Sequence, residues 1–217
     1  MRIVLASGSP RRRQLLAQVG LDFDVVVSDA DETIDGAPYD QVATLARRKA
    51  EATLDLMVAQ GNGGGASGNE ATGEVIIIAA DTLVALEDGG MFRVLGKPAD
   101  AGEAFEMLSA LAGRKHTVHT GVAILRVHAG ASLEAECGEC TVFVVSTDVY
   151  FRPLTDAQVH AYIATGEPFD KAGAYGIQEK GALLVERVHG DFYTVMGLPI
   201  ARLCLELEKM GVPVWGK

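Results

Sequence analysis

Residues 3–13 read Ile-Val-Leu-Ala-Ser-Gly-Ser-Pro-Arg-Arg-Arg, an apolar run that passes through small residues into three consecutive cations. The run at 3–6 predicts a short buried strand. Ser9 can cap the helix that follows, and Pro10 suits the first helical position, where its missing N–H is not needed. Helix-start amides, the positive end of the helix dipole and neighbouring guanidinium groups together form an anion site. The stretch therefore predicts a phosphate site at a strand–helix turn, although a capped helix with solvated arginines is compatible with the same residues.

The composition is that of an ordinary globular protein with one large domain or two small lobes. The chain has 217 residues, of which 48% are hydrophobic and 22% charged, and its formal net charge is -10. An acidic chain is poorly suited to non-specific nucleic-acid binding or to an anionic membrane surface. No apolar run approaches the roughly 18 residues that span a bilayer, and the start of the chain lacks the apolar core of a signal peptide. We expect a cytoplasmic protein that binds neither nucleic acid nor membrane.

Cysteine and histidine usage leaves one metal alternative open. The chain has three cysteines, an odd number that suggests no disulfide framework and favours a reducing compartment. Cys137 and Cys140 form a C-x-x-C pair, and His116 and His119 lie upstream at the same spacing. Both pairs fall in strand-like segments, where residues i and i+3 face opposite sides, which disfavours a shared zinc ion. A redox C-x-x-C pair usually opens a helix, and this one does not.

The remaining pattern alternates strands with helices and predicts the α/β class. Strands are expected at 23–27, 74–80 and 182–188, and the two arms of a long hairpin at 116–127 and 139–151. Helices are expected at 39–59, 100–111, 155–165 and 198–209. A flexible Gly-rich insert is expected at 61–73.

Asp81 carries a charge where burial is expected. Residues 74–80 are almost continuously apolar, which predicts a strand covered on both faces that ends at Asp81 and Thr82. Open α/β sheets place ligand chemistry at the carboxyl ends of central strands. The apolar sequence resumes at 83–86, so the carboxylate must be tolerated inside a strand-like run. Burial of that kind needs a partner or a function.

Segments spread over nearly the whole chain carry a family resemblance. They are Ala-Ser-Gly-Ser-Pro-Arg-Arg at 6–12, Leu-Ala-Arg-Arg-Lys-Ala at 45–50, Ala-Asp-Thr at 80–82, Gly-Lys-Pro at 96–98, His-Thr-Gly-Val at 119–122, Glu-Pro-Phe-Asp-Lys-Ala-Gly-Ala-Tyr-Gly-Ile-Gln at 167–178 and Val-Met-Gly-Leu-Pro at 195–199. In this order they resemble the Maf family of nucleotide pyrophosphatases, also called septum formation inhibitor proteins. The resemblance implies a single domain, 1–217, with a mixed twisted sheet, flanking helices and two lobes around a central cleft, related to the inosine triphosphate pyrophosphatases. The insert at 61–73 and the hairpin tip at 129–140 are longer than the family pattern, which bears on the lobe contacts and on any dimer surface.

The resemblance also implies an activity, the hydrolysis of a nucleoside triphosphate to the monophosphate and pyrophosphate with a divalent cation. The segment at 170–178 resembles the branch of the family that acts on dTTP and UTP, and not the branch that acts on 7-methyl-GTP. Asp81 aligns with the family's proposed general base. Positions associated with substrate selection fall on Arg11, Thr82 and Gln178, and polar cleft positions on Ser9, Arg12, Glu32, Lys49 and Lys97.

These positions suit the cleavage of a triphosphate. Catalytic roles are expected for Asp81, Glu32, Lys49 and Lys97, with Mg²⁺ or Mn²⁺ held by Asp81 and Glu32, and Asp81 acting as base, metal ligand or both. Arg12, Lys49 and Lys97 would hold the phosphates and stabilise the departing pyrophosphate. Substrate contacts are expected from Ser7, Ser9, Arg11, Arg12, Thr82, Asp170, Lys171, Tyr175 and Gln178. The expected partner is a small-molecule nucleoside triphosphate, with a homodimer as a further expectation. The alternative function is a nucleotide-sensing binding protein that acts in cell-division control.

Overall fold

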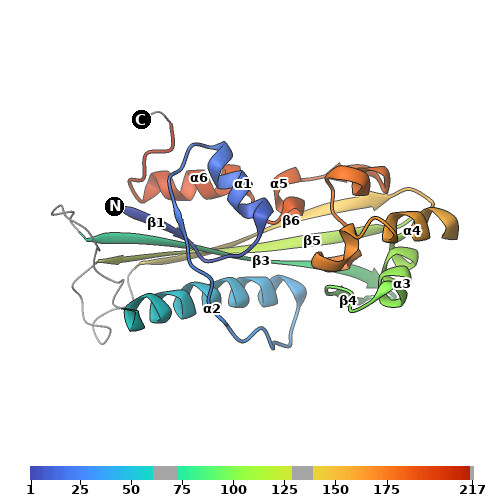
Figure 1. The fold of residues 1–217 in the computed structure, drawn as a ribbon, viewed down its shortest axis with the longest axis horizontal. Helices are drawn as coiled ribbons and strands as arrows, with labels where there is room; N and C mark the ends of the chain where they lie inside the picture. Colours follow the sequence, from blue (N-terminus) through green and yellow to red (C-terminus); the bar gives the residue numbers. More distant parts are fainter. Residues whose placement is uncertain (61–72, 129–138, 216–217) are drawn as a thin grey trace.

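One mixed β-sheet runs through the length of the molecule (Figure 1). The computed structural model describes residues 1–60, 73–128 and 139–215. The sheet has seven strands in the order β2-β1-β3-β5-β6-β7, with β4 paired to β3. The strands are β1 (Arg2–Leu5), β2 (Asp24–Val25), β3 (Glu74–Asp88), β4 (Met91–Leu95), β5 (Lys115–His128), β6 (Cys140–Phe151) and β7 (Val185–His189). The β1–β2 and β1–β3 pairs are parallel and the other pairs antiparallel, which confirms the expected mixed α/β fold.

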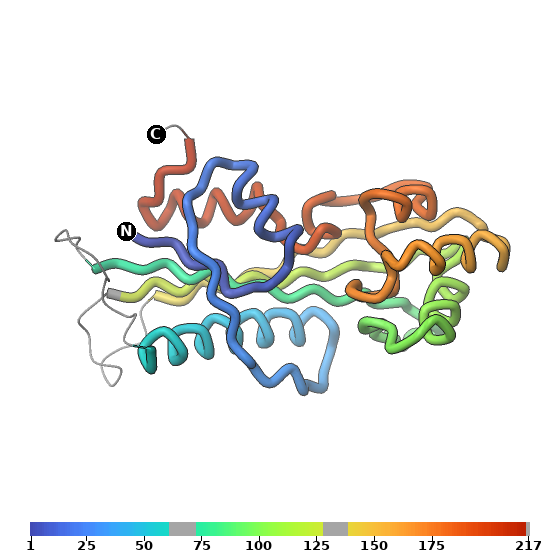
Figure 2. The backbone as a smooth tube through the Cα atoms, viewed as in Figure 1, coloured from blue at the N-terminus to red at the C-terminus, as the bar shows by residue number. Residues whose placement is uncertain are grey.

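Helices cover both faces of this sheet. In Figure 1, α2 (Pro38–Ala59) lies along one face, while α1 (Pro10–Gln18) and α6 (Ile200–Lys209) lie on the other. Towards the opposite end lie α3 (Ala101–Leu111), α4 (Asp156–Ile163) and three 3₁₀ turns at Glu167–Asp170, Ala172–Ala174 and Glu179–Leu183, whereas the short α5 (Phe192–Met196) lies near the middle of the sheet. Figure 2 shows the N-terminus and the C-terminal segment at the same end of the sheet. Among the described residues, no helix has both the length and the apolar character that crossing a membrane requires.

Three apolar clusters divide the interior into two lobes. Leu15 of α1 and Leu203 of α6 belong to a cluster on one face of the sheet. Ala46 and Met57 of α2 belong to a second cluster on the opposite face, because residues alternate sides along β3. The third cluster lies at the other end and joins β3, β4 and β5 to the apolar faces of α3 and α4. The strands therefore form one scaffold that all three clusters share.

The edge of β3 leaves room for a site between the lobes. Its partner on one edge is β5, paired continuously from Glu74 to Ala85. On the other edge β1 pairs up to Ile78, and β4 pairs only from Val84 onward. The residues 79–83 therefore lie between the ends of two different partner strands. The loops that leave β1 and β4 both open at this gap.

Several boundaries differ from the sequence predictions for local reasons. The strand predicted to end at Asp81 continues to Asp88, because β5 pairs with it as far as Ala85 and β4 pairs with it from Val84 to Asp88. The predicted strand at 182–188 begins only at Val185, because a 3₁₀ turn occupies Glu179–Leu183. Neither β4 nor α5 was predicted from the sequence. The insert predicted at 61–73, apart from residue 73, and most of the hairpin tip lie outside the described residues.

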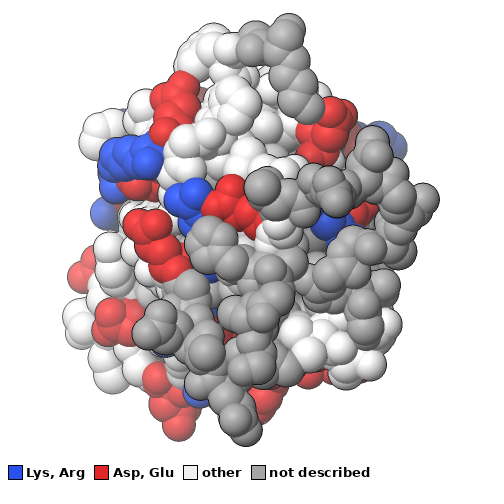
Figure 3. Space-filling model, turned by 90° about the vertical axis from the view of Figure 1, so that its left-hand side faces the viewer, with Lys and Arg blue, Asp and Glu red and all other residues white. Residues whose placement is uncertain are grey.

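Charged side chains of both signs share the surface of the molecule. On the end shown in Figure 3, acidic and basic side chains lie interspersed among the described residues. Several of them form ion pairs across neighbouring strands. Arg2 pairs with Asp24 of β2, and Arg126 of β5 pairs with Glu74 of β3. The exposed pair of Arg2 with Asp24 contributes little to stability.

Candidate active site

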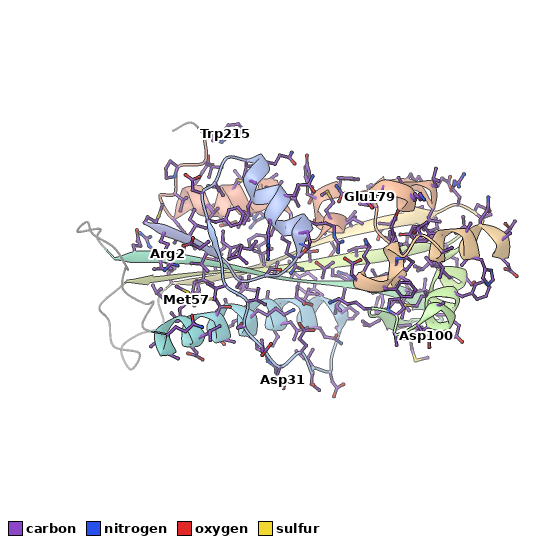
Figure 4. All side chains as sticks on the ribbon, in the orientation of Figure 1. Arg2, Asp31, Met57, Asp100, Glu179 and Trp215 are labelled. Atoms are coloured by element: carbon purple, nitrogen blue, oxygen red, sulfur yellow. The ribbon has the colours of Figure 1, made fainter. Side chains whose placement is uncertain are left out.

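A cavity of about 1050 Å³ lies over the gap at the edge of β3. Its walls come from the β1–α1 turn, the loop before α2, α2 itself, the loop after β4 and the segment around 170–179. Figure 4 shows Asp31, in the loop before α2, and Glu179 on opposite sides of the sheet. The lining includes all the site residues predicted from the sequence, namely Ser7, Ser9, Arg11, Arg12, Glu32, Lys49, Asp81, Thr82, Lys97, Asp170, Lys171, Tyr175 and Gln178. Segments far apart in the sequence thus converge on one space.

Lys49 joins the two carboxylates that were expected to carry the chemistry. Its Nζ lies 2.6 Å from Asp81 Oδ1 and 2.7 Å from Glu32 Oε1. The Asp81 side chain is 11% exposed and that of Lys49 18%, whereas that of Glu32 is 65% exposed. The hydrogen bond from Lys49 lowers the pKa of Glu32, and the positive charges of Lys97 and Arg12 act in the same direction. The pair of carboxylates is therefore held together by a single ammonium group.

Gly121 allows α2 to bring Lys49 this close to Asp81. Gly121 is the register partner of Asp81 in β5. A Cβ atom built on Gly121 would lie 2.2 Å from the carbonyl oxygen of Val42 in α2, so no larger residue fits there without a shift of the helix. The sequence carried a signal of this contact, because a glycine inside a strand pattern often marks a close backbone approach. That signal was not recognised.

Arg12 is fixed by protein acceptors on three elements. It donates to Ser7 Oγ at 3.0 Å, to Thr82 Oγ1 at 3.2 Å and to the carbonyl of Gly197 at 2.8 Å. Burial lowers the pKa of Arg12, while the nearby Asp81 carboxylate raises it. The guanidinium group therefore ties the β1–α1 turn to β3 and to the end of α5.

Thr82 takes part in a relay of hydroxyl groups beneath Arg12. Thr120 Oγ1 donates to the carbonyl of Thr194 at 2.8 Å, so its own oxygen must accept the hydroxyl proton of Thr82, 3.0 Å away. Thr82 Oγ1 in turn accepts from Arg12. Its hydroxyl proton is committed to the protein in this structure, and a direct substrate contact by Thr82 stays a prediction.

Ser9 holds the N-cap position of α1 but does not cap it as the sequence predicted. Its side chain makes no cap hydrogen bond, and Pro10 takes the first helical position as expected. The backbone N–H of Ser9 instead donates to Ser7 Oγ at 3.3 Å. The Ser7 hydroxyl, and not the side chain of Ser9, therefore stabilises this turn.

Arg11 reaches from α1 to the 3₁₀ turn that carries Asp170. Its NH1 lies 3.2 Å from Asp170 Oδ2, and Lys171 Nζ lies 2.5 Å from Asp170 Oδ1. Burial raises the pKa of Asp170, but the hydrogen bond from Lys171 and the two positive charges lower it overall. Lys171 also donates to the carbonyl of Glu167 at 2.6 Å. The Arg11–Asp170 pair joins α1 to the 3₁₀ turn across the cavity, and Lys171 holds that turn in place.

Two tyrosines anchor the segment that carries Gln178. A hydrogen bond of 2.7 Å joins the hydroxyl of Tyr175 to His116 Nε2, and Tyr162 accepts from the backbone N–H of Gly176 at 3.2 Å. Burial lowers the pKa of His116 to about 4. The hydroxyl of Tyr175 is thus engaged inside the protein, although its ring contributes to the cavity wall. Gln178 follows this anchored stretch and lines the same wall.

The residues of the zinc alternative are partly engaged elsewhere. His116 is bonded to Tyr175, whereas His119 Nδ1 lies 2.8 Å from Ser146 Oγ. Cys137 lies outside the described residues, and Cys140 begins β6. Within the described ranges, no three His, Cys, Asp or Glu side chains gather in a way that could hold a metal ion.

A family model and curated relatives match this chain over nearly its whole length. A family model described as Maf-like protein matches residues 2–210. A Bacillus thuringiensis subsp. konkukian protein named dTTP/UTP pyrophosphatase is 41% identical over 98% of this chain and 97% of its own length. A Bacillus cereus protein of the same name is 42% identical over 98% of this chain and 92% of its own length. Among solved structures, the Staphylococcus aureus Ham1 protein is similar over 70% of this chain and 72% of its own, with a TM-score of 0.38 and 15% identity.

Proposed function

The chain belongs to the Maf-like protein family, and from that premise we propose that it hydrolyses dTTP and UTP to the monophosphate and pyrophosphate. Relatives that carry the name dTTP/UTP pyrophosphatase match it over 98% of its length at 41–42% identity. The observation that carries the proposal is the meeting of Asp81, Glu32 and Lys49 in a cavity that Arg11 and Lys97 also line. Carboxylates and cations in one water-accessible space suit phosphoric anhydride cleavage.

Asp81 is the residue best suited to take the proton of the attacking water. It lies on a rigid strand that pairs with β5 on both sides of it, and its side chain is largely shielded from bulk water. A general base needs a fixed position within hydrogen-bond reach of the water that it activates. Arg11 and Lys97 would hold the phosphates, so that the charge on the leaving pyrophosphate is neutralised as the α–β bond breaks.

The residues present fit a divalent cation. Two carboxylates converge on one point, and Mg²⁺ is typically bound through one or two carboxylates together with substrate phosphates. We propose that Asp81 and Glu32 hold Mg²⁺ or Mn²⁺. When bound, such an ion would supply charge neutralisation at the phosphates and lower the pKa of a bound water.

The base of the nucleotide is expected to be read beside Gln178. Uracil and thymine each present a carbonyl next to an N–H, and a side-chain amide can answer this pair with one donor and one acceptor. The anchoring of the preceding segment by Tyr162 and Tyr175 supports a fixed orientation for the residues that follow. The homodimer and the cytoplasmic location stay predictions.

The direct test is pyrophosphate release from a panel of nucleoside triphosphates, with Mg²⁺, with Mn²⁺ and with a chelator. We expect turnover of dTTP and UTP well above that of CTP, ATP and GTP, and only in the presence of the metal. Binding of dTTP or UTP without any pyrophosphate release would favour the nucleotide-sensing alternative. Equal turnover of all bases would contradict the proposed specificity but not the reaction.

A further inference from the structure

The ammonium of Lys49 stands at the point where the two carboxylates could share a metal ion. It contacts oxygens of Asp81 and Glu32 at 2.6 Å and 2.7 Å. A divalent ion bound to these same two oxygens would stand at contact distance from the ammonium, and the repulsion between the two cations opposes that arrangement. Metal binding at these oxygens therefore requires Lys49 to move.

The internal pairing has a physical reason. The Asp81 side chain is only 11% exposed, and a buried carboxylate without a partner is strongly unfavourable. Lys49 supplies that partner from α2, whose distance to β5 is set by the contact of Gly121 with Val42. A nucleotide in the cavity would bring several negative charges within reach of the same side chain. The four-carbon stem of lysine allows its ammonium to move between such partners.

We infer that Lys49 is an exchangeable counter-ion, which holds Glu32 and Asp81 together in the free protein and releases them to a divalent ion when nucleotide phosphates take its ammonium. This inference rests on the proposed function, since it needs both a metal and a triphosphate. It predicts that metal and nucleotide each strengthen the binding of the other, because coupling between two sites is reciprocal. It also assigns Lys49 a role in the order of binding, beyond that of a fixed phosphate contact.

The test measures Mn²⁺ binding alone, by the loss of the free-ion signal in electron paramagnetic resonance. The intact protein should bind Mn²⁺ weakly by itself, and about tenfold or more tightly with a non-hydrolysable α,β-imido analogue of UTP. Lys49→Met should bind Mn²⁺ about tenfold or more tightly than the intact protein without any nucleotide, and the analogue should then add little. Lys49→Gln should behave in the same way.

Lys97→Met is the matched control, since it removes an equal charge from the same cavity without breaking the contacts of Asp81 or Glu32. Its gain in Mn²⁺ affinity should be clearly smaller. Thermal unfolding gives a second readout, because Mn²⁺ should raise the melting temperature of Lys49→Met more than that of the intact protein.

Three outcomes would overturn the inference. They are an unchanged or weakened Mn²⁺ affinity in both Lys49 variants, an equal gain in Lys97→Met, and no Mn²⁺ binding by any variant with or without the analogue. The proposed function is judged separately, by pyrophosphate release from the intact protein. Normal hydrolysis together with any of these outcomes would reject the exchange by Lys49 and leave the reaction in place.

Discussion

At the scale of single residues, Asp81 combines a rigid backbone with a partner that can be replaced. Asp81→Asn keeps the shape of the side chain but removes its basicity and most of its affinity for cations. We expect turnover of dTTP and UTP to fall at least about a hundredfold, as is typical for loss of a general base. Nucleotide affinity measured without a divalent ion should change by only a small factor. Steady-state kinetics and equilibrium titration of the folded variant check this, and near-normal turnover would rule out Asp81 as the base.

Gln178 is the residue expected to choose the base. In Gln178→Ala, kcat/KM for UTP and dTTP should fall relative to CTP by about tenfold to a hundredfold, because a mispaired polar group costs on the order of 1–3 kcal/mol. The measurement is kcat/KM for all three nucleotides in both proteins. An equal loss for the three would mean that Gln178 only supports its own loop, and that the base is recognised elsewhere in the cavity.

At the scale of elements, the contact between α2 and β5 controls the geometry of the carboxylates. Gly121→Ala would place a methyl group 2.2 Å from the carbonyl oxygen of Val42. The helix must then move away from the sheet, which should lower the free energy of unfolding by about 1–3 kcal/mol and weaken the contact of Lys49 with Asp81. Denaturant unfolding and pyrophosphate release together measure both effects.

Gly96→Ala is the control for that variant. Nothing lies within 4 Å of a Cβ atom built on Gly96, and its φ is not in the left-handed region. Its free energy of unfolding should stay within about 0.5 kcal/mol of the unmodified value, as is usual for surface substitutions. A loss of stability as large as that of Gly121→Ala would show that the close approach of α2 is not the cause.

The elements also show how far sequence reasoning reaches. Long periodic segments such as 39–59 were predicted correctly, because one face of each is apolar and the period is clear. The end of β3 was not, because the apolar run at 83–86 indicates that the chain continues as a strand past Asp81, whereas the end at Asp88 depends on the pairing with β4. The short α5 depends on a cap by Asp191, whose carboxylate accepts from the backbone of Thr194 at 2.8 Å, and a five-residue helix leaves no periodic signal.

The residues that line the cavity were predictable from the sequence, but the contacts among them were not. These residues could be found because they follow strands or belong to segments that resemble a family. The sequence did not reveal that Arg12 is held by Gly197, or that the Tyr175 hydroxyl is bonded to His116. Such contacts join residues more than fifty positions apart, and local patterns carry no information about them.

At the scale of the whole molecule, a buried histidine makes stability depend on pH. Burial lowers the pKa of His116 to about 4, below the 6.5 of an exposed histidine. Between pH 4 and pH 6.5, His116 is therefore protonated in the unfolded chain but neutral in the folded protein. The contribution is fully present above pH 6.5 and is lost as the pH falls towards 4, by up to about 3 kcal/mol.

His116→Phe isolates this contribution, because it keeps an aromatic ring between Phe151 and Tyr175 but cannot titrate. Urea unfolding at several values between pH 7 and pH 4 should give a flatter pH dependence for the variant than for the unmodified protein. The carboxylates contribute equally to the pH dependence of the free energy of unfolding in both proteins, so their contribution cancels when the two curves are subtracted. Parallel curves would show that His116 does not titrate in this window.

The unbroken pairing of β3 with β5 beneath the cavity has a mechanical consequence. A hinge between the lobes would have to bend the continuous ladder that runs from Glu74 to Ala85. The sheet therefore fixes the distance between the β1–α1 turn on one side of the cavity and the loop after β4 on the other. If the sheet keeps the two loops at a fixed separation, we expect the opening to favour a phosphate chain of the length that fills it.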